Sequence, residues 1–245
     1  MRTSLRIPTS RTHGVYGIYD GVRGKPLVIF VHGLPGSVVD GLHERACAWF
    51  AAHGYATFRY NLYGWQSDAR QLIDTTLRIL ADDLDAIVRF FRSQGTKRIF
   101  VVGHSLGGPQ ILLAKEQAFD GAVLLDPSYD ISFIKEKYGF PGGKYIRSLR
   151  GYFMQWGINT VIGRAMAQEV DAIDWNALPK TFHKPLKIIA AEKGVLVRGA
   201  RAYFSHAQAP KNLQIVKGAT HYFNDRPGME DRVFASIFSW FEKYR

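Results

Sequence analysis

One pentapeptide, Gly103-His104-Ser105-Leu106-Gly107, constrains the fold of this chain more than any other stretch. The residues before it, 98–102, are rich in β-branched and aromatic side chains, which favour a buried strand. Residues 108–114 have the pattern of the opening turns of a helix, where Pro109 is tolerated. A strand, a sharp turn at a G-x-S-x-G serine and a helix form a nucleophile elbow. The helix N-terminus would then place free N–H groups beside the hydroxyl of Ser105.

Two further segments lie where such an elbow requires them. The apolar run 26–31 ends in His32-Gly33-Leu34, and the N–H of Leu34 is a candidate donor to an oxyanion, together with the N–H of Leu106. Downstream, the strand-like residues 213–216 lead through a turn of small residues to His221. A serine followed much later by a histidine is one of the orders in which a catalytic triad is built. We therefore expect His221 to be the catalytic base.

From about residue 12 to the C-terminus, the chain resembles the α/β-hydrolase superfamily, in particular serine esterases and lipase-like members of the feruloyl-esterase or small carboxylesterase type. The resemblance implies an α/β fold with a mostly parallel central sheet and helices on both faces. It also implies that carboxylic esters are cleaved through an acyl-enzyme on Ser105, with an oxyanion hole formed by the N–H groups of Leu34 and Leu106. Relatives that dehalogenate haloalkanes or open epoxides carry an aspartate at the elbow, so Ser105 argues against both activities.

The acid of the triad is missing from its usual place. In the resembling family it follows the seventh strand in a pattern like G-x-x-D-x-x-V, and in residues 191–197 of this chain the aspartate position holds Gly194. Our candidate is Asp126, which ends the predicted sixth strand, 121–125. Neighbouring strand ends lie only about 4.8 Å apart, so a carboxylate moved by one strand still reaches the histidine loop. Some lipases of the resembling family carry their acid at this position.

Other interpretations of the acid stay open. Asp126 could instead cap the turn at Pro127, a common role for aspartate. Glu192 is the next candidate, because it lies in the loop where the acid is usually found, and Asp130 and Asp225 are weaker ones. The acid could also be absent, with Gly194 an engineered replacement of an aspartate.

The connection between the sixth and seventh predicted strands, 127–184, is far longer than the ~2–6 residues of an ordinary connection. In the resembling family an insertion here is a lid over the serine. We expect a helical lid within a single domain, 1–245, with helical segments near 143–155, 157–170 and 171–177. Phe153 and Trp156 are candidates to bind an aromatic or acyl group beneath the lid. Alternatively, these aromatic side chains only attach the lid to the body.

Elsewhere strand and helix patterns alternate, as a mostly parallel sheet covered on both faces requires. We expect edge strands at 5–7 and 15–19, an inner strand at 56–60, and helices near 40–53, 75–94 and 229–244.

The net charge of +11 and the pI near 9.8 would steer anionic substrates or hold the protein near anionic surfaces. The sequence has no zinc-ligand spacing, phosphate loop or nucleic-acid-binding pattern, so we expect no metal, no cofactor and no nucleic-acid partner.

Residues 1–8 lack the apolar core of a signal peptide, and no apolar run is long enough to span a membrane. A single cysteine, Cys47, fits a reducing compartment, so we expect a cytoplasmic protein.

The expected partner is a small-molecule ester. Its acid part can be aromatic or an acyl chain, and the molecule can carry a negative charge. The oligomeric state is left open. Three other activities of the same fold stay open: thioesterase, amidase and carbon–carbon bond hydrolase. A non-catalytic binding protein that has lost its acid at Gly194 is the alternative from a different class. The intact Ser105, His221 and oxyanion segments weigh against that loss.

Overall fold

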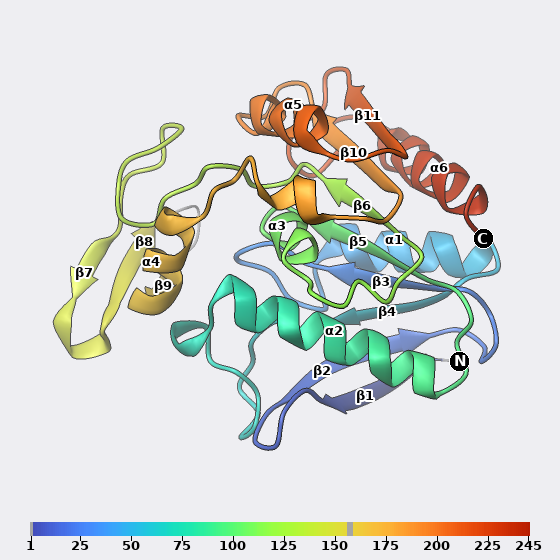
Figure 1. The fold of residues 1–245 in the computed structure, drawn as a ribbon, viewed down its shortest axis with the longest axis horizontal. Helices are drawn as coiled ribbons and strands as arrows, with labels where there is room; N and C mark the ends of the chain where they lie inside the picture. Colours follow the sequence, from blue (N-terminus) through green and yellow to red (C-terminus); the bar gives the residue numbers. More distant parts are fainter. Residues whose placement is uncertain (1, 156–158) are drawn as a thin grey trace.

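The computed structural model describes residues 2–155 and 159–245. Within them, an eight-stranded sheet forms the centre of the molecule (Figure 1). Its strands in spatial order are β1 (Arg2–Pro8), β2 (Gly14–Asp20), β4 (Ala56–Tyr60), β3 (Leu27–Val31), β5 (Ile99–His104), β6 (Gly121–Leu125), β10 (Leu186–Ala191) and β11 (Lys211–Val216). β1 pairs antiparallel with β2, and β2 with β4, whereas all other neighbours in this sheet are parallel. The predicted mostly parallel sheet is confirmed.

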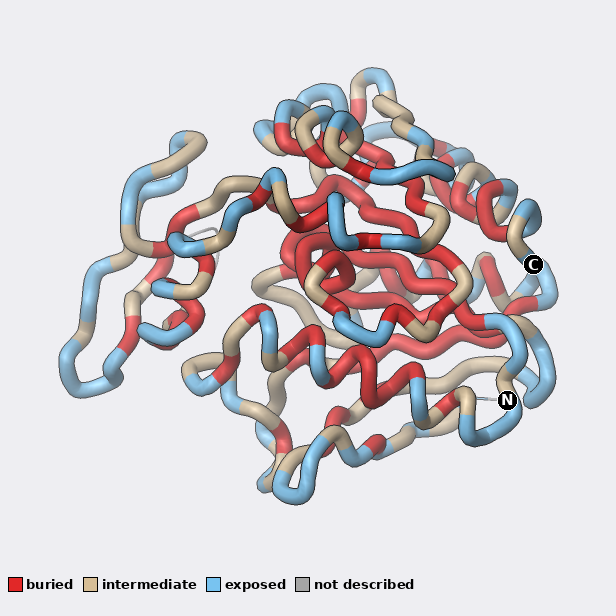
Figure 2. Tube along the Cα trace, viewed as in Figure 1, coloured by how far each residue is buried: buried red, intermediate tan, exposed pale blue. Residues whose placement is uncertain are grey.

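Helices cover both faces of this sheet. One face carries α1 (Gly41–Ala52) and α6 (Met229–Glu242), and the other carries α2 (Leu77–Ser93), α3 (Gly107–Leu112) and α5 (Val197–His206). Successive side chains of a strand point to opposite faces, so each central strand supplies both cores. In β3, for example, Val28 and Phe30 pack with α1 and α6, whereas Ile29 packs with α2. Figure 2 shows these central strands as the most deeply buried part of the molecule.

Two helices begin at side-chain caps. The Oδ1 atom of Asp40 accepts a hydrogen bond from the N–H of Leu42 at the start of α1, at 3.0 Å. The Oγ1 atom of Thr76 accepts one from the N–H of Ile79 at the start of α2, at 3.2 Å. Each cap satisfies a backbone donor that the helix cannot pair, which stabilises the folded state by about 1 kcal/mol.

The insert, residues 127–184, differs from the helical lid that we predicted. It contains a second, three-stranded antiparallel sheet, followed by one α-helix and a short 3₁₀ helix, and Figure 1 shows this sheet projecting from the body. Its elements are β7 (Lys144–Ile146), the 3₁₀ helix η2 (Arg147–Leu149), β8 (Gly151–Gln155), β9 (Asn159–Gly163), α4 (Arg164–Ala172) and the 3₁₀ helix η3 (Leu178–Thr181). Outside the insert, the 3₁₀ helix η1 (Leu72–Asp74) precedes α2.

The predicted helix at 143–155 is therefore wrong. Of the one predicted at 157–170, residues 157 and 158 lie outside the described residues, 159–163 form β9 and the helix begins at Arg164. Of the one predicted at 171–177, only residues 171 and 172 are helical, as the end of α4. The physical reason is the distribution of β-branched and aromatic side chains, which favour strands when they can pair across a ladder. Phe153 of β8, for example, is paired with Lys144 on one side and with Val161 on the other.

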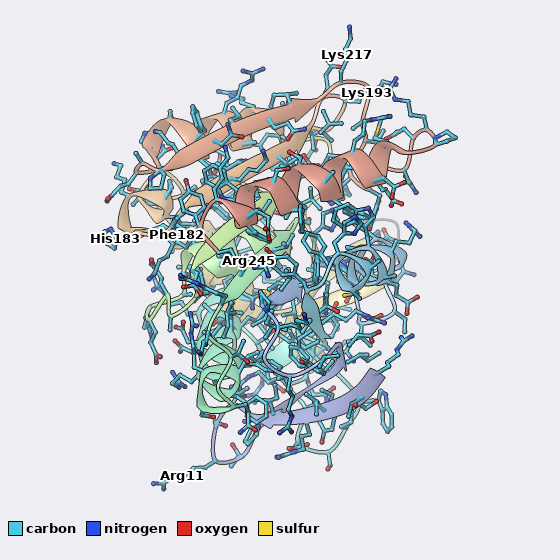
Figure 3. The ribbon with its side chains drawn as sticks, turned by 90° about the vertical axis from the view of Figure 1, so that its right-hand side faces the viewer. Arg11, Phe182, His183, Lys193, Lys217 and Arg245 are labelled. Carbon is cyan, nitrogen blue, oxygen red and sulfur yellow. The ribbon has the colours of Figure 1, made fainter. Side chains whose placement is uncertain are left out.

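The parallel strands place the site. Because β3, β5, β6, β10 and β11 run in the same direction, their carboxyl ends meet at one edge of the sheet, where α/β folds bind ligands. The two outermost pairs of strands lie at opposite ends of the molecule, marked in Figure 3 by Arg11 in the β1–β2 turn and by Lys217 after β11. In the described part of the chain, no helix combines the length and apolar character needed to cross a membrane.

Candidate active site

Ser105 occupies the sharp turn between β5 and α3. Its φ of +53° lies in the left-handed region, which a non-glycine residue adopts only when the surrounding structure holds it there. Three backbone hydrogen bonds do so. The N–H of Ser105 donates to the carbonyl of Leu125, and its own carbonyl accepts from Gly108 and Ser128, all at 3.0 Å. The predicted elbow between a strand and a helix is present, with the serine side chain directed to the carboxyl edge of the sheet.

The glycines of the pentapeptide are explained by close approach of the backbone. A Cβ atom on Gly103 would lie 2.4 Å from the carbonyl oxygen of Gly107. A Cβ atom on Gly107 would lie 2.5 Å from the carbonyl oxygen of Val31 in the neighbouring strand. Larger residues at these positions would push the elbow away from β3.

Asp126 and His221 are in direct contact. The Nδ1 atom of His221 lies 2.6 Å from the Oδ2 atom of Asp126. The Asp126 side chain is fully buried, and its second oxygen accepts a hydrogen bond from the N–H of Ala191 at 3.0 Å. The backbone N–H of Asp126 also donates to Ile189, at 2.7 Å. Both β6 and β10 therefore fix the carboxylate against the imidazole.

The other candidate acids have different partners. Glu192 Oε2 accepts a hydrogen bond from the N–H of Gly218, and Asp225 Oδ2 accepts one from the N–H of Thr220. Asp130 pairs with the ammonium group of Lys137, at 2.5 Å. Among the described residues, none of these three carboxylates is bonded to the imidazole of His221.

Gly194 lies beside the carboxylate of Asp126. A Cβ atom built on Gly194 would be 3.3 Å from Asp126 Oδ2, the oxygen that contacts His221. The loop after β10 and the end of β6 thus present side chains to the same place. An acid at either position would approach the same imidazole.

The two predicted oxyanion donors belong to residues in the wall of the cavity that contains Ser105. Leu34 and Leu106 line the same cavity as Ser105 and His221. Leu106 precedes the first turn of α3, and Leu34 follows the end of β3. Within residues 2–155 and 159–245, neither N–H is bonded to another group of the protein. Both are thus available to an acceptor in the cavity.

Ser128 was not singled out by the sequence analysis. Its Oγ atom lies 3.4 Å from the Oγ atom of Ser105, and its side chain is buried in the wall of the cavity. The carbonyl of Ser128 accepts a hydrogen bond from the hydroxyl of Tyr203, at 2.9 Å. No sequence pattern marks a serine two residues after the acid as a site residue. The contact between Ser128 and Ser105 depends on how the loops after β5 and β6 meet.

Three further histidines surround the site. Burial lowers the pKa of His32 to about 4, and its ring accepts a hydrogen bond from the N–H of Leu62. Burial also lowers the pKa of His104 well below its usual value, and its Nε2 donates to the carbonyl of His221, at 3.0 Å. Burial lowers the pKa of His43 to about 3, and neither of its ring nitrogens has a hydrogen-bond partner. The rings of His32 and His104 are thus both engaged by backbone groups of neighbouring loops.

A cavity of about 300 Å³ opens over Ser105. The insert supplies much of its apolar wall, through Ile131, Phe133, Tyr138 and Phe140, and one cationic side chain, that of Lys137. A larger hollow of about 600 Å³ lies between the α2–α3 region and the insert, but it contains none of the candidate residues.

Phe153, which we predict from the sequence to bind substrate, is not among the residues that line this cavity. Along β8 it alternates with Tyr152 and Met154, which pack against the core. Its side chain is therefore on the opposite face of the small sheet. Trp156, the other candidate, lies outside the described residues. Trp175 packs beside Tyr129 and is buried.

Residues 2–155 and 159–245 contain no group of three or more His, Cys, Asp or Glu side chains arranged to hold a metal ion. Cys47 is free and lies buried in the core of α1.

Comparison with known families gives a match to the profile of the alpha/beta hydrolase family over residues 28–230. Comparison with curated protein sequences gives no significant match. Among solved structures, the chain is similar to Est1E from Butyrivibrio proteoclasticus with ferulic acid bound, with a TM-score of 0.81, 17% identity and 98% of each chain covered.

Two more solved structures are similar over nearly the whole chain. The esterase domain of a Rhodothermus marinus protein has a TM-score of 0.77 and 18% identity, covering 100% of this chain and 99% of that one. Mouse alpha/beta hydrolase domain-containing protein 10 has a TM-score of 0.76 and 15% identity, covering 99% and 100%. At these identities the likeness demonstrates a shared fold.

Proposed function

The chain belongs to the alpha/beta hydrolase family, and from this we propose that it is a serine hydrolase that cleaves carboxylic esters through an acyl-enzyme. The observation that carries the proposal is the 2.6 Å contact between Asp126 and His221 in the wall of the cavity that contains Ser105. A buried carboxylate on Nδ1 of a histidine fixes the tautomer in which Nε2 accepts a proton. That is the form required of a general base.

In the proposed reaction, Ser105 Oγ attacks the ester carbonyl while His221 removes its proton. The N–H groups of Leu34 and Leu106 bind the oxyanion, and each donor contributes roughly 3–4 kcal/mol in comparable sites. His221 then returns the proton to the leaving alcohol, and a water molecule releases the acid by the same steps in reverse. Asp126 stays ionised throughout and stabilises the imidazolium.

Ser128 has a positioning role in this proposal. The two Oγ atoms lie 3.4 Å apart, and either one can be the donor. We propose that the Ser128 hydroxyl donates to Ser105 Oγ, which leaves the Ser105 proton free to be taken by His221. The backbone of Ser128 is fixed by Tyr203, so the donor is held in place before substrate arrives.

The cavity wall supports an acyl or aromatic acid as the substrate class. Its apolar side chains come from the insert and its polar groups cluster at Ser105, as is usual for small-molecule sites. Est1E, which has the same fold, binds the aromatic acid ferulic acid in its solved structure. An ester is favoured over an amide because an alcohol leaves more readily than an amine.

The single free Cys47 supports a reducing, cytoplasmic location.

The proposal is tested with p-nitrophenyl esters of two to twelve carbons and an aromatic acid ester. The wild type should hydrolyse members of this series, and Ser105→Ala should lose the activity while keeping its melting temperature. Thioesters and amides run in parallel identify the bond type. A wild type that turns over none of them would favour the non-catalytic binding protein.

A further inference from the structure

A long stretch of the insert carries charge of one sign. Residues 137–168 contain five lysines or arginines and no aspartate or glutamate. Lys137 is paired with Asp130, but the other four, Lys144, Arg147, Arg150 and Arg164, are exposed. Within the described residues, none of these four forms an ion pair. Elsewhere many arginines are neutralised, as Arg45 is by Glu230 and Arg70 by Asp83.

The strand register gathers three of these charges at one end of the small sheet, whereas Lys144 is paired with Phe153 in the middle of β8. Arg147 and Arg150 flank the turn between β7 and β8. The end of β9 pairs with the start of β8, and the N–H of Arg164 donates to the carbonyl of Arg150, at 3.1 Å. We define the insert tip as Lys144, Arg147, Leu149, Arg150 and Arg164.

One apolar side chain protrudes among these charges. Leu149 is 44% exposed and lies in the turn between Arg147 and Arg150. Tyr145, in contrast, packs on the ring of Tyr152, with the ring centroids 5.1 Å apart. Figures 1 and 2 show the β7–β8 end of the small sheet as an exposed projection from the body. An apolar side chain on a projection brings little stability to the folded chain, because much of its surface stays in contact with water.

The shape of the tip favours a lipid surface over a protein partner. A stable protein interface buries about 800 Å² on each side, which a single turn cannot provide. A lipid headgroup layer, in contrast, accepts a projecting apolar side chain, while neighbouring arginines remain with the phosphates. Anionic lipids also attract basic residues that lie within about 10 Å of the surface.

We propose that the insert tip docks this protein on anionic lipid surfaces. Leu149 enters the headgroup region, and the four basic side chains contact lipid phosphates. The insert also supplies Tyr138 and Phe140 to the wall of the cavity, so docking brings the cavity towards the lipid. The interaction does not depend on hydrolysis, and Ser105→Ala should bind lipid as the wild type does.

The test is sedimentation of the full chain with vesicles of phosphatidylcholine alone or mixed with phosphatidylglycerol. The wild type should bind the mixed vesicles only, and less as salt is added. The variant Lys144→Glu/Arg147→Glu/Arg164→Glu should bind at least about a hundredfold more weakly, because each basic group contributes about fivefold. Glutamate at 164 suits the first turn of α4, so this variant should keep its melting temperature.

The matched control is Arg23→Glu/Lys25→Glu/Lys97→Glu, which changes the net charge equally. These residues are exposed and lie before β3 and β5, at the edge of the sheet opposite the insert. Charges this far from the contact are screened, so the control should bind within about tenfold of the wild type. Leu149→Ser tests the apolar contact at unchanged net charge, and it should weaken binding severalfold.

Three results would overturn the proposal. One is a wild type that binds no anionic vesicle. This result would overturn the proposal even if the wild type bound an acidic protein. Another is an equal loss of binding in the tip variant and the control, which would show that net charge alone is responsible. The third is a Leu149→Ser variant that binds as tightly as the wild type.

Discussion

The carboxylate of Asp126, at the end of β6, contacts Nδ1 of His221 at 2.6 Å. A Cβ atom on Gly194 would lie 3.3 Å from the same carboxylate oxygen, so a side chain at 194 would point to the same place. The carboxylate is fully buried, and the N–H of Ala191 holds its other oxygen. An acid at the end of β6 can therefore contact His221, although His221 follows β11, which is two strands away in the sheet.

Loss of the Asp126 charge should be severe. Asp126→Asn keeps the size of the side chain but favours the wrong tautomer of His221, so we expect kcat to fall by about 10⁴-fold. The measurement is steady-state hydrolysis of an activated ester. Glu192→Gln is the matched control and should change kcat little, since Glu192 is bonded to Gly218. A large loss in the control with a small loss in Asp126→Asn would transfer the role to Glu192.

An acid at position 194 should restore part of the lost activity. In the wild type a Cβ atom on Gly194 would crowd Asp126 Oδ2 at 3.3 Å, whereas Asp126→Ala removes that atom. We therefore expect Asp126→Ala/Gly194→Asp to have a higher kcat than Asp126→Ala alone. The double variant and both single variants should be assayed together. No recovery in a folded double variant would show that a carboxylate at 194 does not reach His221.

Removal of the Ser128 hydroxyl should slow acylation. Ser128→Ala is expected to lower kcat for ester hydrolysis by about fivefold, the equivalent of one hydrogen bond of about 1 kcal/mol, with KM nearly unchanged. Ser132→Ala is the control, because Ser132 lines the same cavity but donates to Asp171. A faster Ser128→Ala enzyme would mean that Ser105 donates to Ser128 in the resting state.

The insert should set preference for the acyl group. Phe140→Ala removes an apolar wall of the cavity, so KM should rise by about tenfold for long or aromatic acyl esters and little for acetate. Phe153→Ala is the control, since Phe153 is on the opposite face of the small sheet from the residues that pack inward. Equal changes for all esters in Phe140→Ala would argue against a role in acyl selection.

Buried histidines should make the fold sensitive to acid. His43 has a pKa of about 3 in the folded chain because of burial, against about 6.5 when unfolded. The unfolded chain then binds more protons below pH 6.5, so this contribution to stability is complete above that pH and is lost as the pH falls towards 3.

His43→Leu removes the titrating group, whose nearest carboxylate, that of Asp40, is 3.7 Å away. Between pH 7.5 and pH 5, the free energy of unfolding should therefore fall by about 2 kcal/mol less in the variant than in the wild type. Urea unfolding at both pH values measures this difference. Identical pH dependence in the two proteins would contradict the assignment.

The sequence was sufficient for the central sheet and for the elbow. Their patterns are local, because the buried strand runs and the pentapeptide at Ser105 each consist of consecutive residues. The contact between Asp126 and His221 could also be foreseen, because parallel strands bring their carboxyl ends together.

The insert could not be predicted in the same way. Short strands such as Lys144–Ile146 have no clear period, and their conformation depends on partners in β8 and β9. The direction of the Phe153 side chain could not be foreseen for the same reason, because it is set by the strand pairing. Ser128 was missed for a related reason, since its proximity to Ser105 arises where two loops meet.

The most direct test of the account is covalent labelling by a fluorophosphonate, which reacts with an activated serine. The wild type should lose activity on labelling, and mass spectrometry should locate one adduct on the peptide that contains Ser105. Asp126→Asn should label far more slowly, and Ser105→Ala should not label there. A folded wild type that acquires no adduct at Ser105 would contradict the proposed serine hydrolase.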